Sequence, residues 1–376
     1  MKFRDLGEQY KQLKEEMDKS IGKVLIDGNF IGGTQVTELE EQLAEYVGVK
    51  HCITCANGTD ALTMVLMAWN IQQGDAVFVP DFTFFASGEV VSFEGATPVF
   101  YDVCQDTFNA DVSSLEQCIN NVIEQGKLRP RAIIAVDLFG QPANYPKLEE
   151  VAKKYNLLLL EDGAQGFGGR IGERQACSFG DAATTSFFPA KPLGCYGDGG
   201  AIFTNDDKVN EYLRSIKVHG KGNYKYDNVR IGWNSRLDTI QAAILQVKLK
   251  AFKEYELEAV NKVAERYTEL LGDLVNTPKV PKGYYSSWAQ YTLRLKSNEQ
   301  REKLQQYLKE REIPTMVYYP KPMHSQKAYE GNENYTECAI TEDLCNTVLS
   351  LPMHPYLTEE EIIVIAEEIR NYLYKR

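Results

Sequence analysis

Long apolar runs are absent from this chain of 376 residues, so no segment reaches the length that a membrane-spanning helix requires. Its start, Met1-Lys2-Phe3-Arg4-Asp5, also lacks the apolar core of a secretory signal peptide. Basic tracts are missing too, and the formal net charge is −12, which argues against a nucleic-acid partner. We therefore expect a cytoplasmic protein that binds neither membranes nor nucleic acids.

Cysteine is present, but it lacks the spacing of a metal site or a disulfide framework. The eight cysteines are scattered, and Cys52 and Cys55 form a single Cys-x-x-Cys pair. A zinc site would need a second pair, so we expect no metal ion. We expect residues 51–56 to form a buried strand instead, because free cysteine commonly behaves as a small apolar residue. Nucleotide-binding fingerprints are missing as well: the sequence has no Walker lysine motif and no Gly-x-Gly-x-x-Gly between a strand and a helix.

What the chain does have is an alternation of short apolar runs and helix-patterned segments. The first ~25 residues and Thr37–Val47 show helical spacing. The apolar runs predict strands at Cys52–Cys55, Ala76–Pro80, Thr97–Tyr101, Ala132–Val136, Leu157–Leu160 and Ala201–Thr204. Runs without strict alternation are typical of strands buried on both faces, so the pattern predicts an α/β fold around a largely parallel sheet.

The pattern changes near Asp238. Helical spacing continues without glycine or proline from there to about Leu271, and shorter mixed segments follow. We expect a long helix that links a large N-terminal domain, residues 1–245, to a smaller α+β domain, residues 246–376.

One lysine, Lys191, stands between two prolines and ahead of a glycine-rich run, Gly197-Asp198-Gly199-Gly200. Proline restricts the local backbone and forbids a helix through the lysine, and glycine permits close approaches. Taken alone, such a lysine is more often an ordinary loop residue. The residues at other predicted strand ends change that interpretation.

Several polar and aromatic side chains follow predicted strands, where open α/β sheets bind ligands. Asn57-Gly58-Thr59-Asp60 precedes a helix predicted at Ala61–Trp69, with Thr59 and Asp60 as expected cap residues, and a helix start attracts phosphate. Asp162 can pair with a pyridine nitrogen, Gln165 can reach the same ring, and Phe84 can stack on it. Ser186 can hold a phosphate. Each also has an ordinary structural explanation: a capped helix, a turn residue or a core aromatic.

Together these residues are the set that pyridoxal phosphate requires. The Lys191 amine can form a Schiff base with the cofactor aldehyde and can afterwards move a proton between substrate and cofactor carbons.

The chain also resembles a known family, the DegT/DnrJ/EryC1/StrS sugar aminotransferases, in pieces that span most of its length in the expected order. The matching pieces are Asn57 to Leu62, Thr83-Phe84, Glu161 to Gln165, Ser186 to Lys191, Gly197 to Gly200 and Asn234 to Asp238. The resemblance implies the type I pyridoxal-phosphate fold, with a mixed, mostly parallel sheet flanked by helices and a smaller C-terminal α+β domain. It implies that Lys191 carries the cofactor, that Gly58, Thr59 and Ser186 hold its phosphate, and that Phe84, Asp162 and Gln165 contact its ring.

The resemblance further implies a homodimer, because Asn234 reaches the phosphate of the neighbouring subunit in this family. Relatives that dehydrate sugars replace the lysine by histidine, so the lysine favours transamination.

The implied substrates are a nucleotide-linked keto sugar and an amino donor. The segment from Lys217 to Arg236 holds Lys217, His219, Lys221, Lys225, Arg230 and Arg236 in an acidic chain, which favours local anion binding over a solvated basic loop. Tyr318 and His324 belong to a second candidate segment that resembles a run near the nucleotide in relatives.

The Lys191 segment looks most like that of enzymes acting on UDP-2-acetamido-2-deoxy-3-oxo-glucuronate, with L-glutamate as donor, for surface polysaccharide. Arg236 can then pair with the uronate carboxylate, or else form a structural salt bridge. Three alternatives remain open: a 4-keto-sugar aminotransferase, a regulatory protein that carries pyridoxal phosphate with little turnover, and a binding module without the cofactor.

Overall fold

A seven-stranded sheet forms the centre of the computed structural model, which describes residues 1–224 and 226–374. Its strand order is β1-β9-β8-β5-β4-β2-β3. The strands are β1 (His51–Cys55), β2 (Asp75–Pro80), β3 (Thr97–Tyr101), β4 (Arg129–Val136), β5 (Leu158–Asp162), β8 (Ala182–Ser186) and β9 (Gly200–Thr204). β9 runs antiparallel to both its neighbours, and the other pairs are parallel. This confirms the predicted mixed, mostly parallel sheet.

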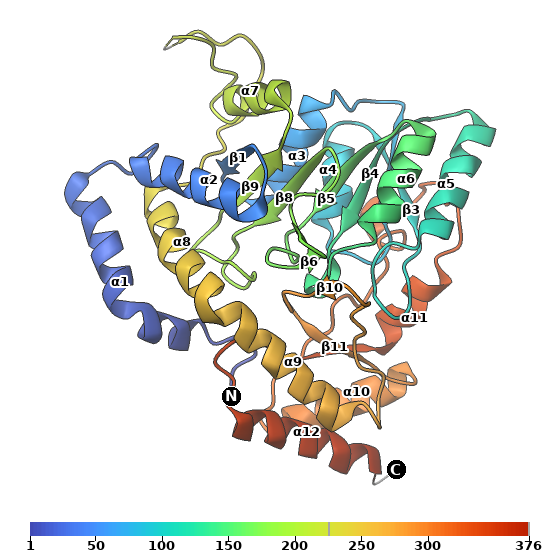
Figure 1. The fold of residues 1–376 in the computed structure, drawn as a ribbon. Coiled ribbons are helices and arrows are strands. Elements are labelled where there is room, and N and C mark those ends of the chain that lie inside the picture. The colour runs from blue at the N-terminus through green and yellow to red at the C-terminus, as the bar shows by residue number, and fades with distance from the viewer. Residues whose placement is uncertain (225, 375–376) are drawn as a thin grey trace.

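Helices cover both faces of the sheet (Figure 1). One face packs against α3 (Gly58–Ala68), α4 (Ala86–Phe93) and α7 (Asp207–Ile216). The other packs against α2 (Thr34–Val47), α5 (Val112–Gln125), α6 (Tyr145–Tyr155) and α8 (Thr239–Ala251). Because both faces are buried, the strands are apolar on successive residues, which is the pattern that the sequence shows.

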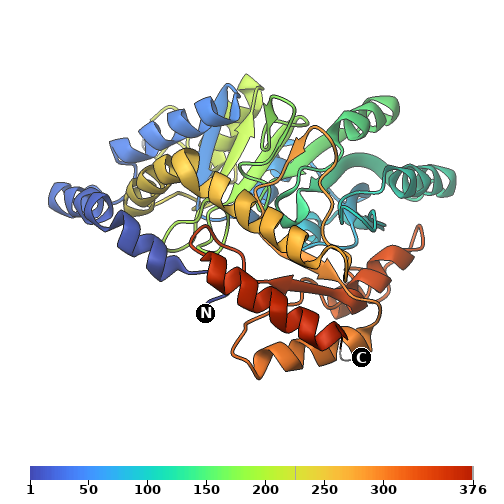
Figure 2. The same ribbon diagram turned by 60° about the horizontal axis from the view of Figure 1, so that its bottom comes forward.

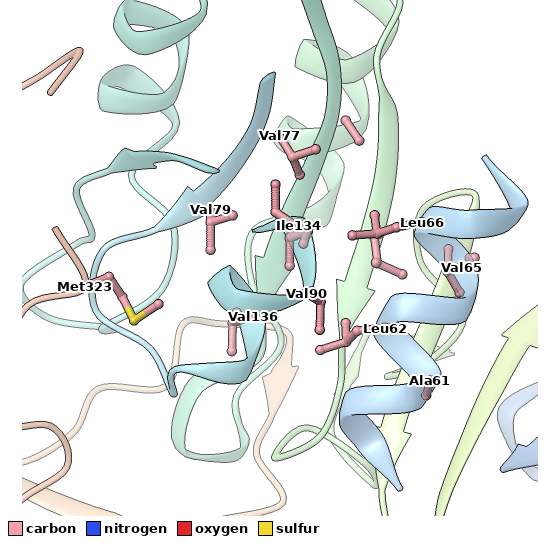
Figure 3. Packing of buried hydrophobic residues seen from close by; sticks show 14 of the residues in the cluster. Ala61, Leu62, Val65, Leu66, Val77, Val79, Val90, Ile134, Val136 and Met323 are labelled. Atoms are coloured by element: carbon pink, nitrogen blue, oxygen red, sulfur yellow. The ribbon is translucent and has the colours of Figure 1, made fainter. Parts of the chain in front are cut away.

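The packing of α3 on the sheet fixes the position of the residues at its start. Leu62 and Leu66 of α3 point at Ile134 of β4 and Val90 of α4 (Figure 3). All four side chains are at most 3% exposed. Each such buried aliphatic side chain contributes about 1.5–3 kcal/mol relative to an exposed one. The start of α3 is therefore held rigidly at the edge of the sheet.

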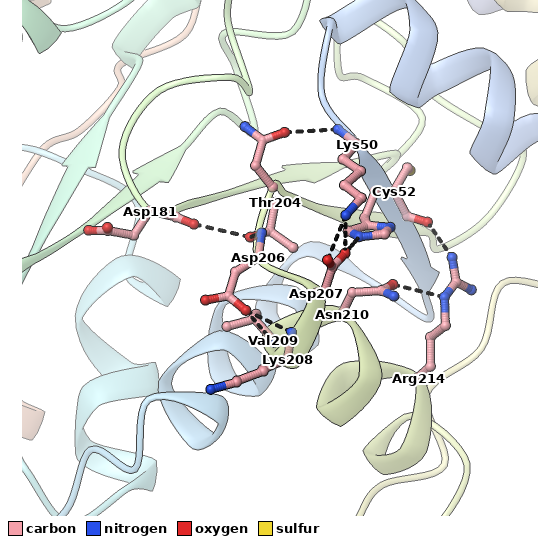
Figure 4. Close-up of polar contacts among 12 residues, drawn as sticks. Lys50, Cys52, Asp181, Thr204, Asp206, Asp207, Lys208, Val209, Asn210 and Arg214 are labelled. Carbon is pink, nitrogen blue, oxygen red and sulfur yellow. Dashed lines mark hydrogen bonds and ion pairs between the residues drawn. The ribbon is translucent and has the colours of Figure 1, made fainter.

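The opposite end of β1 is held by polar contacts (Figure 4). His51 and Lys50 both contact the carboxylate of Asp207, and Arg214 donates to the carbonyl of Cys52 at 3.1 Å. Cys52 and Cys55 are buried in β1, as predicted.

The predicted long helix is present as α8, a π-helical turn at Phe252–Glu256 and α9 (Leu257–Leu271). The first helix, α1 (Leu6–Asp27), packs along α8 through Met17, Ile244 and Val247. No helix within residues 1–224 and 226–374 combines the length and apolarity needed to cross a membrane.

The C-terminal part has its own core beyond α9 (Figure 2). β11 (Tyr291–Arg294) pairs antiparallel with β12 (Val348–Leu351), next to α10 (Asn298–Lys309), α11 (Ala339–Thr347) and α12 (Glu359–Tyr374). A small sheet of β6 (Arg170–Ile171), β7 (Arg174–Gln175) and β10 (Tyr284–Tyr285) joins this part to the large sheet's loops. Short 3₁₀ turns lie at Leu138–Gly140 and Lys327–Tyr329.

Candidate active site

A cavity of about 710 Å³ lies at the carboxyl ends of the parallel strands. Its lining includes most of the residues that the sequence singled out: Gly58, Thr59, Phe84, Asp162, Gln165, Ser186, Lys191 and Tyr318. These residues come from segments up to 260 positions apart and meet because parallel strands end at one edge of a sheet. The sequence-based expectation that they share one site is consistent with this arrangement.

The start of α3 forms one wall of the cavity. α3 begins at Gly58, and the Asn57 side chain caps it by accepting from the backbone N–H of Asp60 at 2.8 Å. The sequence-based expectation of a helix from Ala61, capped by Thr59 or Asp60, was wrong, because Asn57 competes better for the cap position. The free N–H groups of the first turn consequently belong to Gly58 and Thr59, which is where a phosphate would bind.

Glycine is required at two positions around this helix start. A Cβ at Gly58 would lie 2.8 Å from Cβ of Ser186, and a Cβ at Gly200 would lie 2.5 Å from the carbonyl carbon of Asn57. Both distances are shorter than real side chains tolerate. The close approach brings the Ser186 side chain next to the helix start, and Gly58, Thr59 and Ser186 all line the cavity.

Asp162, the last residue of β5, forms the floor of the cavity. Its side chain accepts from the Ser87 hydroxyl at 2.8 Å and from the backbone N–H of Ala164 at 3.2 Å. Burial raises the pKa of Asp162, while the Ser87 hydrogen bond and the charge of Lys191 oppose that rise. Asp162 is only 5% exposed, so its carboxylate is oriented before any ligand enters.

Lys191 lines the same cavity as Asp162, and the charges of the two groups interact. Burial lowers the pKa of the Lys191 amine, the carboxylate of Asp162 opposes this shift, and the guanidinium of Arg4 adds to it. A lysine with a lowered pKa is more often unprotonated and is therefore a better nucleophile and base.

The remaining walls are aromatic and amide groups. Phe84 is 54% exposed although it lines the cavity, so its ring face is open to a flat ligand. The Gln165 amide is held by the N–H of Phe139 at 2.9 Å and by the Tyr319 hydroxyl at 3.2 Å. A ring between Phe84 and Gln165 would therefore meet a fixed surface on each side.

Four predicted substrate or cofactor residues do not line this cavity within one chain: Lys221, Asn234, Arg236 and His324. Asn234 and Arg236 flank Ser235, whose hydroxyl donates to Asp60 at 2.6 Å. Lys221 lies in the exposed segment that follows α7 and extends from the body of the molecule (Figure 1). Lys225, another predicted cation of this segment, falls outside the described residues.

His324 is engaged elsewhere. Its Nδ1 and its backbone N–H contact the two carboxylate oxygens of Asp81 at 2.7 and 2.8 Å. Cys338 lies in the same group, which contains three possible metal ligands. The 2.7 Å contact is that of a hydrogen bond between the imidazole and the carboxylate.

The sequence did not single out several residues of the site. Ser87, Tyr319 and Gln290 also line the cavity, together with Asp198 of the glycine-rich run. Ser87 lies one turn beyond Phe84 at the start of α4. This spacing is the sequence feature that could have predicted Ser87 as a site residue. Tyr319 directly follows the predicted Tyr318.

The fold and the site together define a pyridoxal-phosphate-dependent enzyme. The helix start at Gly58 beside Ser186, the buried Asp162 and Lys191, all of which line the cavity, fit the phosphate, ring nitrogen and aldehyde of this cofactor.

The chain belongs to the DegT/DnrJ/EryC1/StrS aminotransferase family, whose model matches residues 11–370. It is 42% identical to the UDP-2-acetamido-2-deoxy-3-oxo-D-glucuronate aminotransferase of Pseudomonas aeruginosa, over 99% of this chain and 100% of that one. It is also 41% identical to the pleiotropic regulatory protein of Geobacillus stearothermophilus, over 98% and 97% of the two chains.

Solved structures agree with this assignment. A DegT DnrJ EryC1 StrS aminotransferase from Brucella abortus superimposes with a TM-score of 0.97 at 47% identity, over 99% of each chain. NtdA from Bacillus subtilis, solved with bound cofactor PMP, has a TM-score of 0.86 at 26% identity, over 96% of this chain and 82% of that one. The family and fold predicted from the sequence are therefore confirmed, and the cofactor is pyridoxal phosphate.

Proposed function

We propose that this enzyme moves an amino group from L-glutamate to a nucleotide-linked keto sugar, with UDP-2-acetamido-2-deoxy-3-oxo-glucuronate as the acceptor. The product would serve surface polysaccharide biosynthesis. The observation that carries the proposal is that Lys191 and the buried Asp162 line one cavity with the helix start at Gly58 and interact electrostatically there. The acceptor is suggested by the Pseudomonas aeruginosa relative, which shares 42% identity along its whole length.

The residues that line the cavity would have different roles. Gly58, Thr59 and Ser186 would hold the cofactor phosphate. Phe84 and Gln165 would face the ring, and the Asp162 carboxylate would keep a proton on its nitrogen. When bound, pyridoxal phosphate supplies an electron sink for the carbon that gains or loses the amino group. The Lys191 amine, released from the cofactor, would take the proton from that substrate carbon and deliver it to the cofactor's former aldehyde carbon, on the other side of the nitrogen that joins them.

Binding of the nucleotide requires cations that one chain does not place in the cavity. Among the described residues that line it, Lys191 is the one basic side chain. The extended segment after α7 holds exposed Lys221 and Asn234 and partly buried Arg236. We infer that the enzyme is a homodimer in which this segment of each chain completes the other chain's site, with Asn234 at the cofactor phosphate.

The sugar and its nucleotide would meet residues of both segments. Arg236 would pair with the uronate carboxylate and Lys221 with the diphosphate. Tyr318, which already lines the cavity, would contact the substrate directly. Nδ1 of His324 is bound to Asp81, so a substrate contact of His324 would use Nε2. We further propose a cytoplasmic location and a domain division at 245/246, within α8.

The two half-reactions can be tested separately. Glutamate should bleach the visible absorbance of the bound cofactor, and the keto sugar should restore it. Lys191→Ala should abolish turnover in both directions. A panel of UDP-linked 3-keto and 4-keto sugars then identifies the acceptor: restoration by a 4-keto sugar alone would contradict the proposed acceptor while leaving the aminotransferase intact.

Arg236→Lys provides a matched control for the uronate. It keeps the charge but loses the bidentate geometry, so KM for the uronate sugar should rise by roughly tenfold while the glutamate half-reaction stays unchanged. An equal effect on both half-reactions would instead indicate a structural role for Arg236.

The similarity to the Geobacillus stearothermophilus regulatory protein keeps one alternative in view. A protein of that kind with little turnover would retain the absorbance of the cofactor after glutamate is added.

A further inference from the structure

The first residues of the chain lie against the lysine loop and the C-terminal part of the molecule. Figures 1 and 2 both show the amino terminus beside the start of α12, the last helix. Nη2 of Arg4 donates to the backbone carbonyl of Lys191 at 2.8 Å, across 187 positions of sequence. Arg4 is partly buried there, next to Pro192.

Arg4 is held in place by its neighbours on both sides. The carbonyl of Phe3 accepts from the backbone N–H of Met353 at 3.1 Å. Asp5 caps α1 by accepting from the N–H of Glu8 at 2.8 Å. The ring of Phe3 lies 6.3 Å from that of Tyr318, which lines the cavity. The segment is thus fixed between α1 and the C-terminal part, with Arg4 aimed at the lysine loop.

The Arg4 contact completes the anchoring of the Lys191 backbone. The N–H of Lys191 donates to the carbonyl of Phe188 at 2.8 Å, and its carbonyl accepts from Arg4. With both backbone polar groups held, the direction in which the side chain leaves the loop is fixed before the cofactor binds.

Arg4 also supplies charge. The charged groups that act on the Lys191 amine are Asp162, on the end of β5, and Arg4. Arg4 is in turn influenced by Glu256 and by the hydroxyl of Tyr318, and it acts on Lys248 and His354. Burial lowers the pKa of Arg4 to about 10, so its guanidinium remains charged near neutral pH.

We propose that Arg4 is a positioning residue for Lys191, which holds the backbone of the lysine loop and places a permanent positive charge beside the lysine amine. The charge disfavours a second positive charge on Lys191 and so favours the neutral amine. That neutral form adds to the aldehyde carbon of pyridoxal phosphate, and one water leaves. The inference rests on the assignment of Lys191 proposed above.

The test measures how fast the apoenzyme captures pyridoxal phosphate, followed by absorbance over a series of pH values. In Arg4→Gln the rate–pH curve should move to higher pH, and capture at pH 7 should slow by roughly threefold or more. Arg4→Lys, which keeps the charge, should move the curve back toward that of the wild type. The control is Lys2→Gln, because Lys2 is exposed and pairs with Asp5 rather than with the lysine loop; its curve should coincide with the wild type.

If the rate–pH curve of Arg4→Gln keeps the wild-type midpoint, the proposal is overturned. This holds even if the capture rate is lower at every pH, because a loss of structure alone lowers the rate without moving the midpoint. Circular dichroism checks the fold of each variant. Should Arg4→Gln fail to fold, Arg4→Met replaces it as the neutral variant. Lys191→Ala separates this inference from the proposed function: covalent capture by that variant would refute the role of Lys191 itself, independently of Arg4.

Discussion

Lys191 and Asp162 have pKa values shifted in opposite directions by the same cause. Removing either charge from water is unfavourable, so burial lowers the pKa of the amine and raises that of the carboxyl, while each group's charge limits the shift of the other. The two residues therefore form a matched pair even before a cofactor is bound. In the proposed reaction their functions differ, because Lys191 would release its proton and Asp162 would retain its charge.

A substitution at Asp162 tests that difference. Asp162→Asn keeps the shape and the hydrogen bond from Ser87 but loses the negative charge that would hold a proton on the ring nitrogen. Turnover should fall by roughly 100-fold or more, since a charge-stabilising catalytic group is lost. Steady-state kinetics with glutamate provide the measurement.

Ser87→Ala is the matched control, because it removes one hydrogen bond to Asp162 and leaves the charge in place. Its effect should be about tenfold. If Asp162→Asn lowered turnover no more than Ser87→Ala does, the negative charge of Asp162 would not be needed for catalysis.

At the scale of elements, two buried carboxyl groups, those of Asp137 and Glu161, interact at the tips of β4 and β5. Asp137, just after β4, accepts from the Tyr145 hydroxyl at 2.7 Å and from the N–H of Ala143 at 3.0 Å through Oδ1. Its Oδ2 is buried without a donor. The carboxyl group of Asp137 interacts with that of Glu161 on β5, which itself accepts from the N–H groups of Cys177 and Phe179. Two interacting buried carboxyl groups favour a proton between them, and burial raises the pKa of Asp137 to about 7.

This shared proton gives the fold a pH dependence of definite sign. The pKa of Asp137 is higher in the folded chain than in the unfolded one, so its contribution to stability is complete below about pH 4 and is lost as pH rises through 7. In the Asp137→Asn variant, the side-chain amide N–H donates to Glu161 at every pH, so no titrating proton is needed there. The loss of unfolding free energy between pH 4 and 7 should therefore be smaller in this variant, by on the order of a few kcal/mol.

Urea unfolding of the wild type and of Asp137→Asn at several pH values measures this difference. Parallel stability curves for the two proteins would show that no proton is shared at the strand tips.

The sequence predicted most elements but missed one that matters for the site. β8, Ala182–Ser186, leads into the Lys191 loop, yet its residues are two alanines, two threonines and a serine, and carry little apolar signal. It is a strand because β5 and β9 pair with it on both sides. The sequence did not predict a role for Arg4 either, because a contact between residues 187 positions apart produces no local pattern. The predictions for Asp162 and Gly58 used strand-end position together with residue type, and the prediction for Lys191 used its flanking prolines and the glycine-rich run after it.

On the scale of the whole molecule, one chain alone provides few cations at the site and leaves apolar side chains exposed. The described residues that line the cavity include one cation, and several apolar side chains are exposed, among them Ile26 and Ile231 at 87% and Phe30 and Ile31 at 47%. Such exposure is typical of a surface that meets another chain. A dimer with sites built from both chains accounts for both features.

Mixed dimers provide the test of shared sites. Lys191→Ala and Asn234→Asp should each be almost inactive, the second because it places a negative charge at the cofactor phosphate. When the two are unfolded together and refolded in equal amounts, half of the dimers are mixed and each has one site with both native residues. Activity should return to about a quarter of the wild-type value.

Native mass spectrometry verifies that mixed dimers form. Mixed dimers without any return of activity would mean that each chain builds its site alone.

The central claim is that Lys191 carries the cofactor at the edge of the sheet, and borohydride reduction tests it most directly. The wild-type protein with pyridoxal phosphate is reduced, digested and analysed by mass spectrometry. We predict that the added mass of the reduced cofactor is found on Lys191 in the peptide that contains Ser186 to Tyr196. A label on another lysine, or no label on a protein that retains its native fold, would contradict the account.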